Sequence, residues 1–175
     1  MRRVRYSVAA SLDGYIAGPR GEFDWIPMDP TFDPAAAFAG VDAVLLGRRT
    51  YDLTLQPGAP PWPPGVAVYV FSRTLRAADH PGVTVVGDDA GAAVAALRAT
   101  PGGDVWLFGG GALFGSLLAA GQVDSVEVKV VPILLGEGVP LVPAGAPRTA
   151  LALTRLERST SGTVSLHYDV QRPAV

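Results

Sequence analysis

Three short apolar runs in this chain each end at a cluster of residues that could bind a phosphate. They are VLLGRRT at residues 44–50, VFSRT at 70–74 and VWLFGGGALFG at 105–115. Each run is rich in β-branched or aromatic residues and precedes a plausible helix start, as at the carboxyl edge of an α/β sheet. Backbone N–H groups converge at that edge, and arginines in two clusters add forked donors. The clusters predict a phosphorylated ligand, with a nucleotide cofactor as the first hypothesis.

The glycine run at 109–111 differs from the two common phosphate-binding fingerprints. In the pattern G-x-G-x-x-G, Phe114 fills the third glycine position, and the run follows the fifth expected strand rather than the first. No acidic residue ends the following strand, and no glycine-lysine-serine/threonine string occurs in the chain. Three successive glycines would still let the backbone approach a pyrophosphate more closely than any Cβ permits. The pattern therefore favours a cofactor site assembled from several strand ends.

The elements that position these clusters follow from the apolar periodicity. A long loop that contains Asp13-Gly14 follows the first strand. Residues 56–64 are rich in proline and show no regular pattern, and a hairpin turn is expected at Ser161-Gly162. Parallel βα units come first and antiparallel C-terminal strands last, which predicts an α/β fold with one mixed sheet in a single domain. Strands are expected at about 4–11, 42–46, 66–71, 83–86, 105–108, 126–131, 150–157 and 163–171, and helices after Asp33, near Thr50, at 90–99 and at 112–120.

Composition excludes several classes of function. With 175 residues, of which 49% are hydrophobic, the chain can bury a sizeable core as one domain. A net charge of −2 argues against a general nucleic-acid binder. Without cysteines the chain can have no disulfides, thiolate zinc sites or cysteine nucleophiles, and we therefore expect a cytoplasmic protein. Its two histidines are far apart in the sequence and make a poor metal site. The first apolar stretch is interrupted at Asp13 and Gly14, too early for a signal peptide or a membrane span.

Six motifs, in order, resemble those of a known family. They are SLDGYIAG, DW, LLGRRTYD, FSRTL, WLFGGGALFGSLLAAGQVD and VVPILLGEGVPL. Together they resemble the small dihydrofolate-reductase-like proteins related to the reductase domain of riboflavin biosynthesis, over nearly the whole chain. The resemblance implies a dihydrofolate-reductase-like fold, an NADPH cofactor, hydride transfer to a small heterocyclic substrate, and pairing into a homodimer through sheet-edge elements.

The same resemblance implies which residues contact NADPH. The first two clusters would bind the adenosine-side phosphates, the third would lie along the pyrophosphate, and the backbone around Ala9 and Ile16 would face the nicotinamide carboxamide. The implied residues are Gly47, Arg48, Arg49 and Thr50 in the first cluster, Ser72, Arg73 and Thr74 in the second, and Gly109, Gly110, Gly111, Leu113 and Phe114 in the third.

The sequence differs from two groups of related enzymes in ways that narrow the choice of reaction. True dihydrofolate reductases carry a carboxylate inside the first helix, whereas the expected helix here reads AAAFAG. Asp33 stands just before that helix, and its neighbour Pro34 favours a capping role. The zinc deaminase signature that often accompanies the riboflavin enzymes is absent from this cysteine-free chain. Folate reduction therefore ranks below a stand-alone reductase of a pterin-like or pyrimidine-like compound.

Hydride transfer needs little side-chain chemistry beyond a proton donor. The candidate catalytic residues are Asp13, Asp24 and Lys129, and each has a plainer alternative. Asp13 could form a turn with Gly14, and Asp24 could be a solvated loop acid beside Trp25. Lys129 could occupy the solvent face of a strand. The sequence leaves these alternatives open.

The arginines and the overall function have alternatives too. Of the adjacent Arg48 and Arg49, one is expected to face the ligand, while the other packs over the next helix or pairs with Asp52. Arg73 is expected either to contact phosphate or to cap its turn. The competing functions are a nucleotide-binding protein without catalysis, a flavin-binding protein at the same sheet edge, and a true dihydrofolate reductase.

Overall fold

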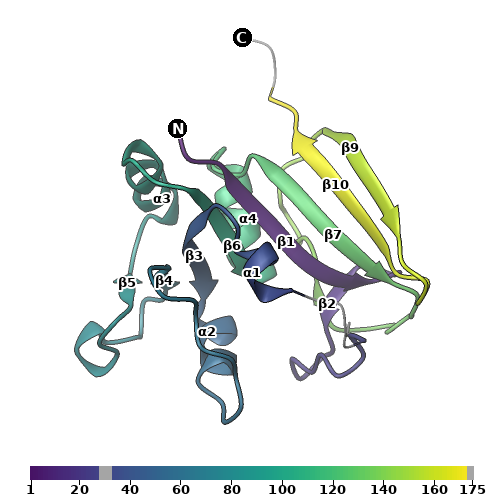
Figure 1. The fold of residues 1–175 in the computed structure, drawn as a ribbon, viewed down its shortest axis with the longest axis horizontal. Helices are drawn as coiled ribbons and strands as arrows, with labels where there is room; N and C mark the ends of the chain where they lie inside the picture. Colours follow the sequence, from purple (N-terminus) through teal and green to yellow (C-terminus); the bar gives the residue numbers. More distant parts are fainter. Residues whose placement is uncertain (28–32, 173–175) are drawn as a thin grey trace.

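An eight-stranded sheet forms the centre of the protein (Figure 1). The structure is a computed structural model that describes residues 1–27 and 33–172. The strand order is β5-β4-β3-β6-β1-β7-β10-β9, and the pairings from β5 to β7 are all parallel. β10 runs antiparallel to both β7 and β9. The strands are β1 (Val4–Ser11), β3 (Val41–Gly47), β4 (Ala67–Phe71), β5 (Thr84–Val86), β6 (Asp104–Gly109), β7 (Ser125–Val131), β9 (Leu151–Arg158) and β10 (Val164–Val170). The mixed α/β sheet predicted from the sequence is confirmed.

Two of the helices follow parallel strands directly, and a glycine sets where each of them begins. α2 begins at Arg48 rather than near Thr50, and α4 begins at Gly111 rather than Ala112, because Gly47 and Gly110 take extended backbone conformations as N-caps. The helices are α1 (Pro34–Ala37), α2 (Arg48–Thr54), α3 (Ala90–Ala99) and α4 (Gly111–Ala119), and a 3-10 turn, η1, lies at Ala77–Asp79.

The first helix is shorter than the sequence indicated. Asp33 caps it by accepting a hydrogen bond from the Ala35 N–H at 2.9 Å, as its position before Pro34 predicts. The helix ends at Ala37, and Gly40 beyond it takes a φ of +76°. The expected capping role of Asp33 is confirmed.

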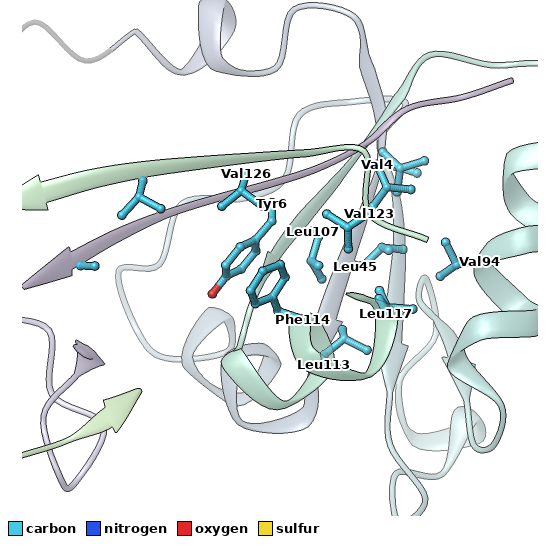
Figure 2. Close-up of a cluster of buried hydrophobic side chains, with 14 residues drawn as sticks. Val4, Tyr6, Leu45, Val94, Leu107, Leu113, Phe114, Leu117, Val123 and Val126 are labelled. Atoms are coloured by element: carbon cyan, nitrogen blue, oxygen red, sulfur yellow. The ribbon is translucent and has the colours of Figure 1, made fainter. Parts of the chain in front are cut away.

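A buried cluster fills the space between the sheet and α4 (Figure 2). The rings of Tyr6 and Phe114 stack with centroids 4.0 Å apart, and Leu45, Leu107 and Leu117 are fully buried beside them. Burial raises the pKa of the Tyr6 hydroxyl well above its usual value. A second cluster on the opposite face packs Tyr51 and the aromatic side chains near α1 against β3 and β4. The apolar runs that precede the three sequence clusters therefore anchor both faces of the sheet.

A buried ion pair fastens the amino edge of this sheet. Asp124 accepts hydrogen bonds from the Val4 N–H at 2.8 Å, from Arg98 at 2.9 Å and from Arg172 at 2.7 Å. The Arg98 side chain is only 7% exposed, whereas the Arg3–Asp169 pair nearby lies in solvent. Removing one member of a buried pair leaves the other charge without compensation, which costs far more than losing an exposed pair.

Asp124→Asn should lower the free energy of unfolding by about 3 kcal/mol, because Arg98 stays buried without its carboxylate. The matched variant Asp169→Asn should change it by less than about 1 kcal/mol. Urea denaturation followed by tryptophan fluorescence measures both. Equal losses for the two variants would contradict the view that Asp124 is the structural anchor.

Candidate functional site

The register of three adjacent strands brings the three sequence clusters to one edge. Gly47 at the end of β3 pairs with Phe71 at the end of β4, and Leu46 pairs with Gly109 at the end of β6. Each cluster begins where its strand ends, and the three strands are parallel neighbours. The predicted convergence of the clusters at the carboxyl edge is therefore present in the fold.

The first cluster separates its two arginines. Arg48 Nε donates to both carboxylate oxygens of Asp52, at 2.8 and 3.0 Å, one turn along α2. Arg49 is exposed and has no ion pair with any residue that the structure describes. Of the two alternatives left by the sequence, Arg48 is thus the one that pairs with Asp52, and Arg49 is available at the edge.

The second cluster is a turn held by a serine. Ser72 Oγ accepts hydrogen bonds from the N–H groups of Thr74 and Leu75, at 3.2 and 3.0 Å. Ser72 therefore caps this turn, and Arg73 is not needed for it. Arg73 and Thr74 are exposed, and within residues 1–27 and 33–172 no ion pair involves Arg73.

The third cluster lies against the first through its glycines. A Cβ at Gly109 or Gly110 would lie 3.4 Å from Thr50 Oγ1, and one at Gly47 would lie 3.6 Å from the Gly110 nitrogen. Gly109 also has a φ of +156°, which side chains rarely permit, and the Gly109–Gly110 peptide is cis. The glycines therefore let the ends of β3 and β6 and the Thr50 hydroxyl come close together, with Gly109 buried and Gly47, Gly110 and Thr50 partly exposed.

The start of α4 presents backbone donors at the same place. Its N-cap, Gly110, has no side chain with which to bond the first-turn N–H groups, and the first helical hydrogen bond runs from the Phe114 N–H to the Gly110 carbonyl at 3.1 Å. Ile16 reaches this helix start, since its Cδ1 would be 3.8 Å from a Cβ at Gly111. The geometry suits a negatively charged group at the start of α4.

Two residues expected to contact a cofactor have buried side chains. Leu113 is 8% exposed and Phe114 is 2% exposed, and the Phe114 ring stacks on Tyr6 in the core. The Phe114 side chain therefore packs between α4 and β1, whereas Leu113 Cβ would lie 3.9 Å from a Cβ at Gly47, at the end of β3. The expected contacts of Leu113 and Phe114 with a cofactor stay predictions.

Asp13 holds two loops together. Its carboxylate accepts hydrogen bonds from Ser11 Oγ at 2.6 Å and from the N–H groups of Leu135 and Gly136, the latter at 2.7 Å. These hydrogen bonds keep the pKa of Asp13 below its usual value. The bond from Ser11 has the largest effect, and the bonds from the backbone N–H groups add to it. Asp13 is therefore ionised at neutral pH, which makes it a poor proton donor.

The other two catalytic candidates lie on different elements. Asp24 is exposed on the rim of a shallow cavity beside Trp25, whose indole N–H donates to the Glu22 carbonyl at 3.3 Å. Lys129 is exposed on β7, where it pairs with Ala9 of β1. Ala9, expected at the nicotinamide end, is thus two residues from the end of β1. The roles of Asp24 and Lys129 stay predictions.

Sequence reasoning missed a two-stranded ribbon that covers the start of α4. It pairs β2 (Tyr15–Ala17) with β8 (Val139–Pro140) and lies apart from the main sheet (Figure 1). A Cβ at Gly111 would lie only 2.6 Å from the Pro140 carbonyl oxygen. A strand of two residues that includes a proline gives no periodic signal, so only the glycine at 111 hinted at a close neighbour.

Comparison with known proteins agrees with this arrangement. Residues 2–165 match the family described as the RibD C-terminal domain. The chain belongs to this family. The Bacillus subtilis protein YyaP, whose own function is uncharacterized, is 32% identical to it over 178 residues, covering 95% of this chain and 94% of YyaP.

Solved structures share the fold. A putative riboflavin biosynthesis protein from Shewanella sp. PV-4 superposes with a TM-score of 0.83 at 28% identity, covering 98% of this chain and all of the other. A deaminase/5-amino-6-(5-phosphoribosylamino)uracil reductase from Thermotoga maritima gives 0.72 at 19% identity, covering 97% of this chain and 57% of the other. Dihydrofolate reductase from Enterococcus faecalis, complexed with NADP(H), gives 0.70 at 16% identity, covering 97% of each chain. The fold is therefore that of the dihydrofolate-reductase-like reductases. Among the described residues, no helix has the length and hydropathy needed to cross a membrane.

Proposed function

We propose that this chain is an NADPH-dependent reductase that transfers a hydride to a small heterocycle, either pterin-like or pyrimidine-like. The observation that carries the proposal is the meeting of three phosphate-binding clusters on the adjacent ends of β4, β3 and β6. One of them opens onto the uncapped start of α4. A dinucleotide has separate phosphates that such a row of turns can bind together.

The residues at this edge fit NADPH. Gly47 and Gly110 are partly exposed beside the buried Gly109, and a Cβ at Gly109 or Gly110 would lie 3.4 Å from Thr50 Oγ1. We assign the pyrophosphate to the exposed glycine backbone here and to the start of α4. We assign the adenosine-side phosphates to Arg49 and Arg73, the exposed arginines of their clusters.

The chemistry of the proposed reaction divides between cofactor and protein. NADPH supplies the hydride when bound, and the chain must orient its nicotinamide against the acceptor and exclude water. Because Asp13 is held ionised by its hydrogen bonds, it is the weakest of the three candidates for delivering a proton. Asp24 and the Lys129 ammonium are the remaining donors that we propose.

We propose a planar acceptor. Phe38, Trp62, Trp106 and Phe108 are half-buried and contact one another beside β6, with the centroids of Trp106 and Phe108 5.2 Å apart and those of Trp62 and Phe108 5.3 Å apart. A flat heterocycle bound beside this cluster would make favourable stacking contacts. Because Asp33 caps α1 and no acid lies within that helix, a pyrimidine-like acceptor is favoured over a folate.

A panel of acceptors tests the proposal. NADPH fluorescence titration should show binding, and NADPH oxidation at 340 nm should be seen with dihydrofolate or a ribosylaminouracil. Binding without turnover across the panel would favour a nucleotide-binding protein without catalysis. A yellow purified protein would favour flavin at the same edge.

Arg73→Ala should weaken NADPH binding by about 10- to 100-fold and NADH binding by less than about twofold, because a charged hydrogen bond to the 2′-phosphate is lost. Titration of each variant by cofactor fluorescence provides the measurement. Arg158→Ala, at the exposed end of β9, is the matched control and should leave both affinities unchanged. Equal losses for NADPH and NADH would refute the assignment of Arg73 to the 2′-phosphate.

We also propose that the chain forms a homodimer through β9. This edge strand leaves Leu151, Leu153 and Leu156 exposed at 43%, 54% and 59%. If two copies pair antiparallel about Leu156, Arg155 of each copy lies opposite Glu157 of the other, so the edge complements itself. Such pairing would also protect an otherwise open strand.

Arg155→Glu should weaken the homodimer about tenfold or more, because carboxylates then oppose one another at two symmetric positions. The double variant Arg155→Glu/Glu157→Arg should restore the dimer, since opposite charges face each other again. Sedimentation equilibrium at low salt measures the dissociation constants. A chain that is monomeric throughout, or a double variant no better than the single one, would rule out this interface.

A further inference from the structure

Two loops that are far apart in the sequence form one unit over the start of α4. We call residues 12–18 and 132–141 the arm. Within it, β2 pairs with β8, the Leu12 N–H donates to the Ile133 carbonyl at 2.8 Å, and the Leu141 N–H donates to the Gly14 carbonyl at 2.8 Å. The two halves of the arm are therefore joined to each other by backbone hydrogen bonds at both ends.

One carboxylate joins the arm to the end of β1. Ser11 Oγ donates to Asp13 at 2.6 Å and accepts the Tyr15 N–H at 2.9 Å. Asp13 also accepts the Leu135 N–H at 3.2 and 3.1 Å and the Gly136 N–H at 2.7 Å. Ser11 is buried, so the network is fixed at its β1 end. Both Asp13 oxygens are occupied by these partners.

This network is more than a local turn. Leu135 and Gly136 are 122 and 123 residues from Asp13 in the sequence, whereas an Asp-Gly turn would bond only to its own neighbours. Hydrogen bonds to an ionised carboxylate are also stronger than those between neutral groups. Asp13 is thus the charged contact between the two halves of the arm.

The position of the arm decides how much space lies over α4. A Cβ at Gly111 would lie 2.6 Å from the carbonyl oxygen of Pro140, at the end of β8. It would also lie 3.8 Å from Cδ1 of Ile16, on β2. A Cβ at Gly138 would lie closer still to its neighbour, 2.2 Å from the Ala17 carbonyl oxygen. The arm therefore has little freedom to shift while these contacts hold, and a shift would change the shape of the space beside the start of α4.

We propose that Asp13 is a positioning residue, whose carboxylate fixes the arm over the start of α4 by binding the backbone of Leu135 and Gly136. It sets the shape of the cofactor end of the site and does not touch the acceptor. This inference rests on the proposed function for its effect on NADPH. Its effect on the arm itself does not depend on any ligand.

Amide hydrogen exchange of the ligand-free chain, followed by NMR, tests the effect on the arm. Asp13→Ala should accelerate exchange at Leu135 and Gly136 and also at Gly111, Ala112 and Leu113. Asp13→Asn keeps one acceptor oxygen and should give a smaller change at the same amides. Asp79→Asn, on the exposed η1 turn, should change none of them. Faster exchange at 135–136 with no change at 111–113 would overturn the proposal.

Cofactor binding and turnover test the effect on the site. Asp13→Ala should weaken NADPH about tenfold, with Asp13→Asn between it and the native chain, while turnover at saturating NADPH stays within about twofold of native. A catalytic role predicts the reverse, with turnover lost and NADPH affinity kept, and that result would overturn the proposal. If the native chain binds no NADPH, the proposed function fails, whereas the exchange experiment still decides the role of Asp13.

Discussion

The parallel register of β4, β3 and β6 is the constraint on which the rest of the structure depends. Because Gly47 pairs with Phe71 and Leu46 with Gly109, three strands end at one level and three turns meet there. A shift of one residue in either pairing would move a turn out of line and turn its apolar residues to the wrong face. The two buried clusters on opposite faces of the sheet fix this register.

Close approach of backbone is the second requirement of the site. The glycines after β3 and β6 let α2 and α4 begin immediately at the strand ends, with Thr50 in contact range of the Gly109–Gly110 backbone. The arm packs on the other side of the same helix start, at Gly111. Glycines therefore allow the close contact with Thr50 on one side and with the arm on the other. The site is thus built largely from backbone, in agreement with a reaction in which the cofactor carries the chemistry.

The sequence was sufficient for the sheet and for the three clusters, because both depend on local patterns. Short β-branched runs, helix starts and the Ser161-Gly162 hairpin are each encoded by neighbouring residues. The stacking of Phe114 on Tyr6 was missed because its position after the glycines resembled a ligand-binding sequence, while the contact depends on how α4 packs on β1, more than 100 residues away in the sequence. The partners of Asp13 could not be found either, since hydrogen bonds to residues 135 and 136 leave no periodic trace. The choice between Arg48 and Arg49 needed the side-chain contact with Asp52.

Hydrogen exchange of the native chain with and without saturating NADPH shows whether one edge of the sheet binds one dinucleotide. We expect slower exchange in peptides covering residues 47–50, 72–75 and 109–113, with β9 and β10 unchanged. Binding of NADPH that leaves 109–113 unprotected, or that protects only residues elsewhere, would contradict this expectation.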